Sequence, residues 1–190
     1  MKYISIDIET TGLEKRNAQI IEVGAVFDDL ANQQPLDKLP TFHAYLLPYN
    51  NQMYGEPYAL SMHPKIIRRI AIQEEGFTYI EEDELPEKFA GWVEGLVEDG
   101  FLHTTKFTAA GKNFAAFDRQ WLEDIEGWTD HVKCHHRSLD VGNMFVDLAN
   151  DDTMPSLDEC LKRAGIEKEV AHTAVEDALD VVRLLRSRVA

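Results

Sequence analysis

The chain has 190 residues, of which 44% are hydrophobic and 28% charged, and its formal net charge is −15. This composition is ordinary for a globular protein, and we expect a single domain over residues 1–190. Two cysteines exclude a disulfide-dense scaffold, and the lack of an apolar run of about 20 residues excludes a membrane-spanning protein. Because the chain enters a strand at once without a signal stretch, a cytoplasmic location with no membrane partner is expected.

Strands fill the first part of the sequence and helices alternate with strands later, which indicates an α/β protein. The Gly, Asn and Pro residues of 50–57 predict a flexible loop. The hydrophobic periodicity predicts, in chain order, strand 2–9, strand 19–28, strand 41–47, two helices, strand 105–111, a helix, a short strand or turn near 137–141, a helix, a helix from Ser156 to about Ala164, and a last helix.

Capping boxes mark the starts of the last two helices. Ser156 and Glu159 form the first, and Gly165 should end that helix. Thr173 and Glu176 form the second. The apolar side of the last helix should consist of Val175, Ala178, Leu179, Val182 and Leu185.

The first strand carries two carboxylates on one face. Residues 3–9 alternate, so that three isoleucines share one face while Asp7 and Glu9 share the other. At a rise of about 3.3 Å per residue, the backbones of the two acids lie about 7 Å apart, and both side chains can reach one ion. A strand with one solvated face would alternate in the same way, but the T-T-G-L turn that follows makes the pair more specific.

Asp118 follows a short apolar segment. Residues 107–111 are typical of a buried strand, and Phe114, Phe117 and Trp121 then recur at helical spacing. Asp118 is therefore expected early in a helix, just beyond the end of the strand. Taken alone, an acid at this position is equally explained by the helix dipole.

His172 and Asp177 flank the start of the last helix. With Thr173 as the cap, His172 lies just outside the helix and Asp177 lies within its first turns. A loop imidazole and a helical carboxylate can then face one site. The alternative is a dipole-stabilised Asp177 and an ordinary surface histidine.

Together the segments supply four carboxylates and one imidazole, which is the set of groups that a two-metal phosphodiesterase needs. Two divalent cations about 3.5–4 Å apart activate a water, neutralise phosphate oxygens and offset the charge on the leaving oxygen. Mg²⁺ and Mn²⁺ prefer such hard oxygen ligands. A nearby histidine can accept the proton of the attacking water.

The three segments resemble, in the correct order, the three motifs of the DEDDh family of 3′ to 5′ exonucleases, which includes polymerase proofreading subunits, ribonuclease T and oligoribonuclease. The first motif, D-x-E-T-T-G-L, is matched at every fixed position by Asp7 to Leu13. The second fits Ala116 to Leu122, with Trp in place of the usual Phe, and the third, H-x-x-x-x-D, fits His172 to Asp177. Residues 138–140 and 155–161 resemble connecting segments of the family, so the resemblance spans nearly the whole chain.

The resemblance implies a ribonuclease H-like mixed sheet flanked by helices, and a metal-dependent 3′ to 5′ exonuclease that releases nucleoside 5′-monophosphates from single-stranded DNA or RNA. Asp7, Glu9 and Asp177 would bind the Mg²⁺ or Mn²⁺ that holds the nucleophilic water. Asp7 would bridge to a second cation, which Asp118 would reach through water. His172 would be the general base. The residues that would contact the terminal nucleotide are Thr10, Thr11, Gly12 and Leu13.

Two features depart from the family pattern. Proofreading members commonly carry His-Asn ahead of the second-motif aspartate, where this chain has Asn113 and Phe114. The acidic stretch from Glu74 to Glu84 is an elaboration on the core.

The net charge of −15 conflicts with nucleic-acid binding, because proteins that bind long nucleic acids usually present a basic surface. Cations would offset the site carboxylates, and an enzyme that holds only a few terminal nucleotides makes few phosphate contacts. The segment 62–70 is locally basic, and Met62 and His63 in it could line the substrate entrance, with Phe77 and Tyr79 as stacking partners. The alternative is an amphipathic surface helix whose cations face water.

Two other functions stay open. One is a non-catalytic module that binds nucleic-acid ends or a polymerase, although five titratable groups speak against a purely structural role. The other is a phosphodiesterase for dinucleotides or short oligonucleotides, which the acidic surface would suit and which salt would affect less. DNA and RNA are both open as the substrate, and a polymerase or a second copy of the chain as the partner.

The cysteines are expected to be free thiols in a reducing compartment, because Cys134 and Cys160 lack C-x-x-C spacing. Cys134 lies among His131, His135 and His136, which raises the alternative of zinc. The spacing of these residues matches no standard zinc finger.

Overall fold

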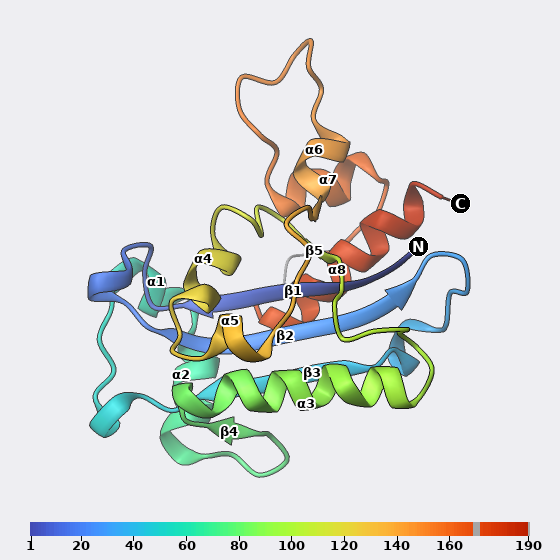
Figure 1. Cartoon of the computed structure of the whole chain (residues 1–190). Coiled ribbons are helices and arrows are strands. Elements are labelled where there is room, and N and C mark those ends of the chain that lie inside the picture. The colour runs from blue at the N-terminus through green and yellow to red at the C-terminus, as the bar shows by residue number, and fades with distance from the viewer. Residues whose placement is uncertain (169–171, 190) are drawn as a thin grey trace.

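The structure is a computed structural model that describes residues 1–168 and 172–189, and it is built on a mixed sheet (Figure 1). The strands lie in the order β4-β3-β2-β1-β5-β6. β1, β2 and β3 are antiparallel neighbours, β5 runs parallel to β1, β6 to β5, and β4 to β3. The bounds are β1 Lys2–Thr10, β2 Ile20–Asp29, β3 Thr41–Leu46, β4 Tyr79–Ile80, β5 Ala109–Gly111 and β6 Leu139–Asp140.

Helices cover both faces of this sheet, with α3, α4 and α5 in front of the strands and α8 behind them in Figure 1. Among the described helices, none combines the length and the hydropathy that crossing a lipid bilayer requires. The helices of the described chain are α1 Pro57–Met62, α2 Pro64–Ile72, α3 Leu85–Glu98, α4 Asp118–Glu123, α5 Trp128–His131, α6 Val141–Phe145, α7 Leu157–Arg163 and α8 Ala174–Ser187.

β1 is an internal strand that is buried on both faces. Ile4, Ile6 and Ile8 belong to the hydrophobic cluster that includes the buried side chains of α3, α4 and α5. Tyr3, on the opposite face, packs in a second cluster with the apolar side of α8. The alternation that the sequence shows in β1 therefore does not arise from a solvated face, and Asp7 and Glu9 point into the layer between the sheet and the helices behind it.

α8 packs its apolar side on β1 and β2, with Ala178, Val182 and Leu185 buried as predicted. Val175 and Leu179 are only half-buried, and Val181 and Leu184 are buried in addition. The predicted capping box at its start is wrong, because Thr173 makes no side-chain cap bond. At the same end of the helix, the N–H of Ala174 donates to Glu22 Oε2 on β2.

The preceding helix follows its capping prediction more closely. Ser156 Oγ accepts a hydrogen bond from the N–H of Glu159, and Gly165 ends the segment with a φ of +71°. The side chain of Glu159 turns to Arg163 rather than to the backbone of Ser156, so half of the box forms.

Short elements account for the other differences from the predicted order. β4 is a two-residue strand that the periodicity did not indicate, and α3 is a third helix where two were expected before β5. The predicted strand 105–111 shortens to β5, and Phe107 contributes only an isolated bridge to Cys134. One helix was expected after β5, whereas α4 and α5 are separated at Gly127. β4 was not predicted because a strand of two residues is too short to show the alternation of apolar and polar residues.

Candidate metal centre

Carboxyl oxygens of Asp7, Glu9 and Asp177 lie within 4.8 Å of one another. Asp7 and Glu9 stand on the same face of β1, as the alternation predicted. Asp177 lies in the first turn of α8, and its N–H donates to the carbonyl of Thr173. The start of α8 thus brings a carboxylate from the end of the sequence to the two from its beginning.

Asp118 is the first residue of α4, close to its predicted position, and it is buried. Its Oδ1 accepts a hydrogen bond of 3.1 Å from the N–H of Ile8, the residue between Asp7 and Glu9. β5, the neighbour of β1 on this side, ends at Gly111. The Asp118 carboxyl therefore accepts the Ile8 N–H, which has no strand carbonyl opposite it. Asp118 is therefore next to the cluster without being one of its three converging groups.

Burial and mutual repulsion make the charged forms of these acids unfavourable. Burial, with repulsion from Asp118 and Glu9, raises the pKa of Asp7 well above its ordinary value. Burial raises the pKa of Glu9 to about 9, with Asp177 as the next cause. Burial also raises the pKa values of Asp118 and Asp177 to about 7. A cation among these groups would reverse the effect, because a positive charge favours the ionised carboxylates.

One carboxyl oxygen of Asp177 lacks a hydrogen-bond partner. Its Oδ1 is buried and has no hydrogen-bond partner within the part of the chain that the structure describes. Buried polar atoms are normally satisfied, and each exception calls for a partner such as water or an ion. The hard oxygen donors and this unpaired atom fit a divalent cation such as Mg²⁺ or Mn²⁺.

His172 is exposed and has a left-handed backbone with a φ of +49°. Burial and, next, the charge of His172 lower the pKa of His63, so the two imidazoles are neighbours. His63 Nε2 in turn lies 3.5 Å from Glu9 Oε2. His172 thus lies at the edge of the cluster, and within the described residues it makes no hydrogen bond to the cluster carboxylates.

The residues expected to contact the terminal nucleotide differ in what they present. Thr10 and Thr11 are buried, and Thr10 Oγ1 donates to the carbonyl of Gly12 at 2.8 Å. The side chain of Leu13 is 73% exposed, and its N–H donates to Glu56 Oε1 at 3.0 Å. The turn therefore offers an apolar side chain to a ligand, while the two threonines hold its shape.

α1 ends at Met62, and His63 connects it to α2 beside the cluster. Met62 is exposed, whereas His63 is buried against Glu9 and its Nδ1 has no partner in the described chain. α2 is amphipathic, with Ile66 and Ile70 buried and Lys65 and Arg68 exposed. Lys65 and Arg68 thus face water, as the alternative of an amphipathic surface helix expects, whereas Arg69 is largely covered.

Phe77 and Tyr79, the suggested stacking partners, are already packed. The Arg69 guanidinium lies 4.1 Å from the centroid of the Phe77 ring and donates to the hydroxyl of Tyr45. Tyr79 stacks on Tyr45 with ring centroids 5.5 Å apart. The structure thus uses these rings, and the cation of Arg69, to attach β4 and α2 to the sheet.

Sequence reasoning missed Glu22, Glu56 and His43. Glu22 is 1% exposed, and its Oε1 lies 2.7 Å from His43 Nε2. The sequence does point to Glu22, because it is the one acid in the apolar run 20–27. An acid buried in such a run needs partners that satisfy its carboxylate. The zinc alternative at Cys134 gains nothing from the structure, since the Sγ of Cys134 donates to the carbonyl of His135 and residues 131–136 form no group of convergent metal ligands.

Comparison with known proteins finds no matching protein-family model and no matching curated protein. Solved structures are similar. Cell-death related nuclease 4 (CRN-4) shares 16% identity with a TM-score of 0.66, over 97% of this chain and 62% of that one. Exonuclease I of E. coli, in complex with a dT13 oligonucleotide, shares 18% identity with a TM-score of 0.61, over 97% of this chain and 40% of that one.

The chain therefore spans less than two thirds of either neighbour. The likeness confirms the predicted fold, a ribonuclease H-like mixed sheet flanked by helices.

Proposed function

We propose that the protein is a metal-dependent 3′ to 5′ exonuclease of the DEDDh type, which releases nucleoside 5′-monophosphates from single-stranded DNA or RNA. The observation that carries this proposal is the convergence of Asp7, Glu9 and Asp177 within 4.8 Å. These residues belong to the first and third predicted motifs, and they meet on a fold shared with two proteins named as nucleases.

The residues present fit divalent cations, since the three acids offer hard oxygen donors and Asp177 Oδ1 is buried without a partner in the described chain. Bound Mg²⁺ or Mn²⁺ would supply an activated water and neutralise phosphate oxygens. Asp7, Glu9 and Asp177 would hold the cation, with Asp7 shared with a second cation near Asp118. The hydrogen bond from Ile8 fixes the Asp118 carboxyl for that role.

The other residues of the site orient the substrate and move a proton. A ring nitrogen of His172 would accept the proton of the attacking water, since this exposed imidazole lies beside His63 at the edge of the cluster. Leu13 and Met62 would contact the terminal nucleotide through their exposed side chains. Thr10, Thr11 and Gly12 would shape the turn.

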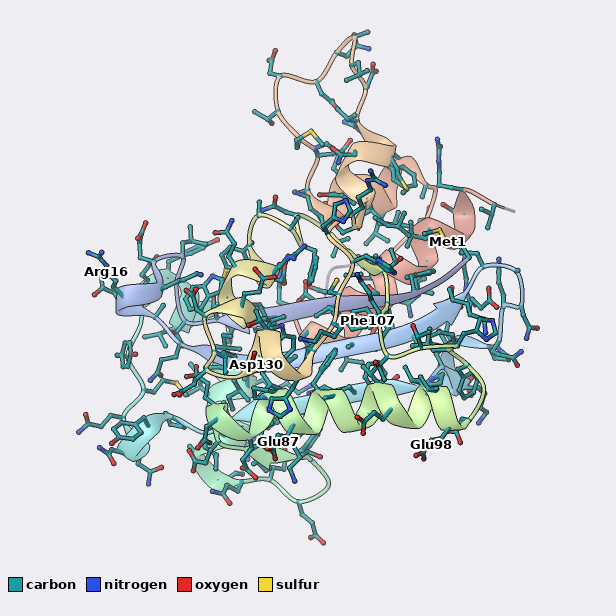
Figure 2. All side chains as sticks on the ribbon, in the orientation of Figure 1. Met1, Arg16, Glu87, Glu98, Phe107 and Asp130 are labelled. Carbon is teal, nitrogen blue, oxygen red and sulfur yellow. The ribbon has the colours of Figure 1, made fainter. Side chains whose placement is uncertain are left out.

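The substrate class draws support from the neighbour that was solved with a dT13 oligonucleotide. The overall charge of the protein also favours short substrates. The outer surface of α3 and α5 is acidic, with Glu87, Glu98 and Asp130 exposed on the face toward the viewer (Figure 2). With a net charge of −15, the protein has little capacity to neutralise a long row of phosphates. A phosphodiesterase for dinucleotides or short oligonucleotides is the second candidate.

The decisive experiment is a time course on 5′-labelled single-stranded RNA and DNA, from dinucleotides to about 20 nucleotides, with Mn²⁺, Mg²⁺ or EDTA. Asp7→Asn tests the site, and Asp130→Asn, an exposed acid on α5, is the control. We expect metal-dependent shortening from the 3′ end by the wild-type protein and Asp130→Asn, and none by Asp7→Asn. Activity on dinucleotides alone would select the second candidate. Undiminished cleavage by Asp7→Asn would remove Asp7 from the mechanism, and no cleavage at all would favour a binding module.

A further inference from the structure

Glu22 occupies a position on β2 that faces the carboxylate cluster. It pairs in register with Glu9 on β1, and the register shifts at the next pair, where Thr10 opposes Ile20. Ile21 is therefore an extra residue in β2, a β-bulge that leaves Glu22 opposite a proposed metal ligand. Bulges re-aim side chains, and this one lies at the end of β1 that carries the site.

Both oxygens of Glu22 are engaged. Oε2 accepts a hydrogen bond of 3.0 Å from the N–H of Ala174, the first residue of α8, and Oε1 lies 2.7 Å from His43 Nε2. An acid that accepts from the first N–H groups of a helix acts as a cap and is favoured by the helix dipole. Here the capping acid comes from another strand of the sheet, while Thr173 at the cap position makes no side-chain bond.

His43 holds the carboxyl of Glu22 from the other side. Its ring packs edge-on against Tyr45, with centroids 4.8 Å apart, and against Phe77 at 6.1 Å. The Phe77 ring carries the Arg69 guanidinium on its face. The orientation of Glu22 is thus fixed by packed aromatic side chains of β3 and of the segment before β4.

From these contacts we infer that Glu22 is a positioning residue, which fixes the start of α8 against the sheet and so holds Asp177 at the distance from Asp7 and Glu9 that cation binding requires. Asp177 follows Ala174 by three residues in the first turn of α8, so a shift of the Ala174 backbone also moves the Asp177 carboxyl. This inference rests on the proposed function for its metal, but its geometric claim can be tested without catalysis.

The chain contains a matched control on the same strand. Asp28 is also fully buried on β2 and also binds α8, where its Oδ1 lies 2.6 Å from Arg186 Nη2. It anchors the far end of the helix, away from the cluster. Loss of Asp28 should therefore destabilise the protein without changing the geometry of the metal ligands.

The experiment compares Glu22→Met, which keeps the length of the side chain but accepts no such bonds, with Glu22→Gln, which can still accept from Ala174 and pair with His43. Asp28→Leu is the stability control. Mn²⁺ affinity is measured by calorimetry, and amide exchange at Ala174 and Asp177 is measured in the metal-free protein. We expect Glu22→Met to weaken Mn²⁺ binding about 10–100-fold, as loss of a group that orients metal ligands does. Amide hydrogen exchange at Ala174 should also be faster in Glu22→Met than in the wild-type protein.

Glu22→Gln should restore both properties, and Asp28→Leu should lower the melting temperature but keep Mn²⁺ affinity. If Glu22→Met does not fold, His43→Leu is used instead, because it removes one contact that holds Glu22. It should also weaken Mn²⁺ binding and accelerate amide exchange at Ala174, each by less than Glu22→Met would.

Equal loss of Mn²⁺ affinity in Glu22→Gln and Glu22→Met would overturn the inference, because charge rather than position would then matter. Unchanged affinity in Glu22→Met, or an equal loss in Asp28→Leu, would overturn it as well. If the wild-type protein binds Mn²⁺ but cleaves nothing, only the proposed function fails. If it binds no Mn²⁺, the proposed function fails, and the exchange rates alone decide whether Glu22 holds α8.

Discussion

Asp7 on β1 pairs in register with Gly24 on β2, and the missing side chain at Gly24 admits the first turn of α8. A Cβ at position 24 would lie 2.4 Å from the carbonyl carbon of Ala174 and from the amide nitrogen of Val175. Both atoms are backbone and cannot rotate away. The approach of α8 to the strand that carries Asp7 therefore requires glycine at this position.

Gly24→Ala should destabilise the protein by about 1–3 kcal/mol, because a methyl group here forces the backbone of α8 off the sheet. It should also weaken Mn²⁺ binding, since Asp177 moves with the helix. Urea unfolding and calorimetry measure the two effects. The control is Gly91→Ala in the middle of α3, where a Cβ meets nothing within 4 Å and should stabilise the helix by about 0.5–1 kcal/mol. A Gly24→Ala protein as stable as the wild type would show that α8 has space to shift.

Metal-free protein should lose stability as the pH rises from about 5 to 9. Burial raises the folded pKa values of Asp177 and Asp118 to about 7 and of Glu9 to about 9, whereas unfolded carboxyls titrate near 4. The folded state thus binds these protons more tightly. Their contribution to stability is complete below pH 4 and is lost as the pH passes the folded values.

Melting temperatures in EDTA across this pH range test the effect. At the alkaline end, a divalent cation at about 100 times its Kd should restore about 2.7 kcal/mol. Asp7→Asn should flatten the pH dependence in EDTA, because it removes one of the repelling charges. Melting temperatures in EDTA that stay constant from pH 5 to 9 would contradict the raised pKa values.

His172→Ala should lower turnover about 10²- to 10⁴-fold, the contribution typical of a general base, and leave Mn²⁺ binding nearly unchanged. His172 is exposed at the edge of the cluster and is not one of its three converging ligands. Single-turnover rates and calorimetry separate the two effects. His103→Ala, at another exposed histidine, is the control and should cleave at the wild-type rate. Equal rates for both variants would assign proton transfer to a different group.

The loop between α6 and α7, which projects from the body of the molecule in Figure 1, should depend on one ion pair. Arg163 binds both carboxyl oxygens of Asp151, at 2.6 and 2.7 Å, and the carbonyl of Phe145 at 2.7 Å. The Arg163 hydrogen bonds lower the pKa of Asp151 to about 2. This pair contributes stability above pH 4, the range in which an unfolded Asp is ionised, and the contribution is lost as the pH falls toward 2.

Carboxyl carbon NMR shifts should therefore show Asp151 titrating near pH 2 in the wild-type protein. In Arg163→Met the pKa should return toward its usual value, and the loop should become more sensitive to proteases. Lys162→Met, which removes the exposed neighbour that pairs with Asp158, should change neither property. An unchanged titration of Asp151 in Arg163→Met would assign the low pKa to the backbone of the loop.

Local patterns in the sequence correctly placed several residues of the candidate site on their elements, and long-range contacts account for what the patterns missed. The alternation in β1 correctly placed Asp7 and Glu9 on one face, because a strand fixes side-chain direction regardless of what covers it. The spacing of Phe114, Phe117 and Trp121 likewise placed Asp118 early in a helix. The local patterns indicated only an α/β protein, and the resemblance of these segments to the DEDDh motifs implied the ribonuclease H-like fold.

The role of Glu22 could not be predicted in this way. Its partners are Ala174 and His43, which lie far away in the sequence, and a single glutamate in an apolar strand does not identify them. The support of the first turn of α8 by the Glu22 carboxyl is likewise a contact between distant residues, which a local capping pattern cannot predict. β4 was missed because a two-residue strand is too short to show a period and its partner β3 lies far away in the sequence.

The distance in sequence between Asp7 and Asp177 has a consequence for the newly made chain. Asp7 and Glu9 are synthesised well before Asp177. Until α8 has emerged and packed on β1 and β2, the carboxylates at the end of β1 lack their third partner. Assembly of the cation site is therefore a long-range step of folding that waits for α8, and a truncation before α8 removes Asp177 from the chain.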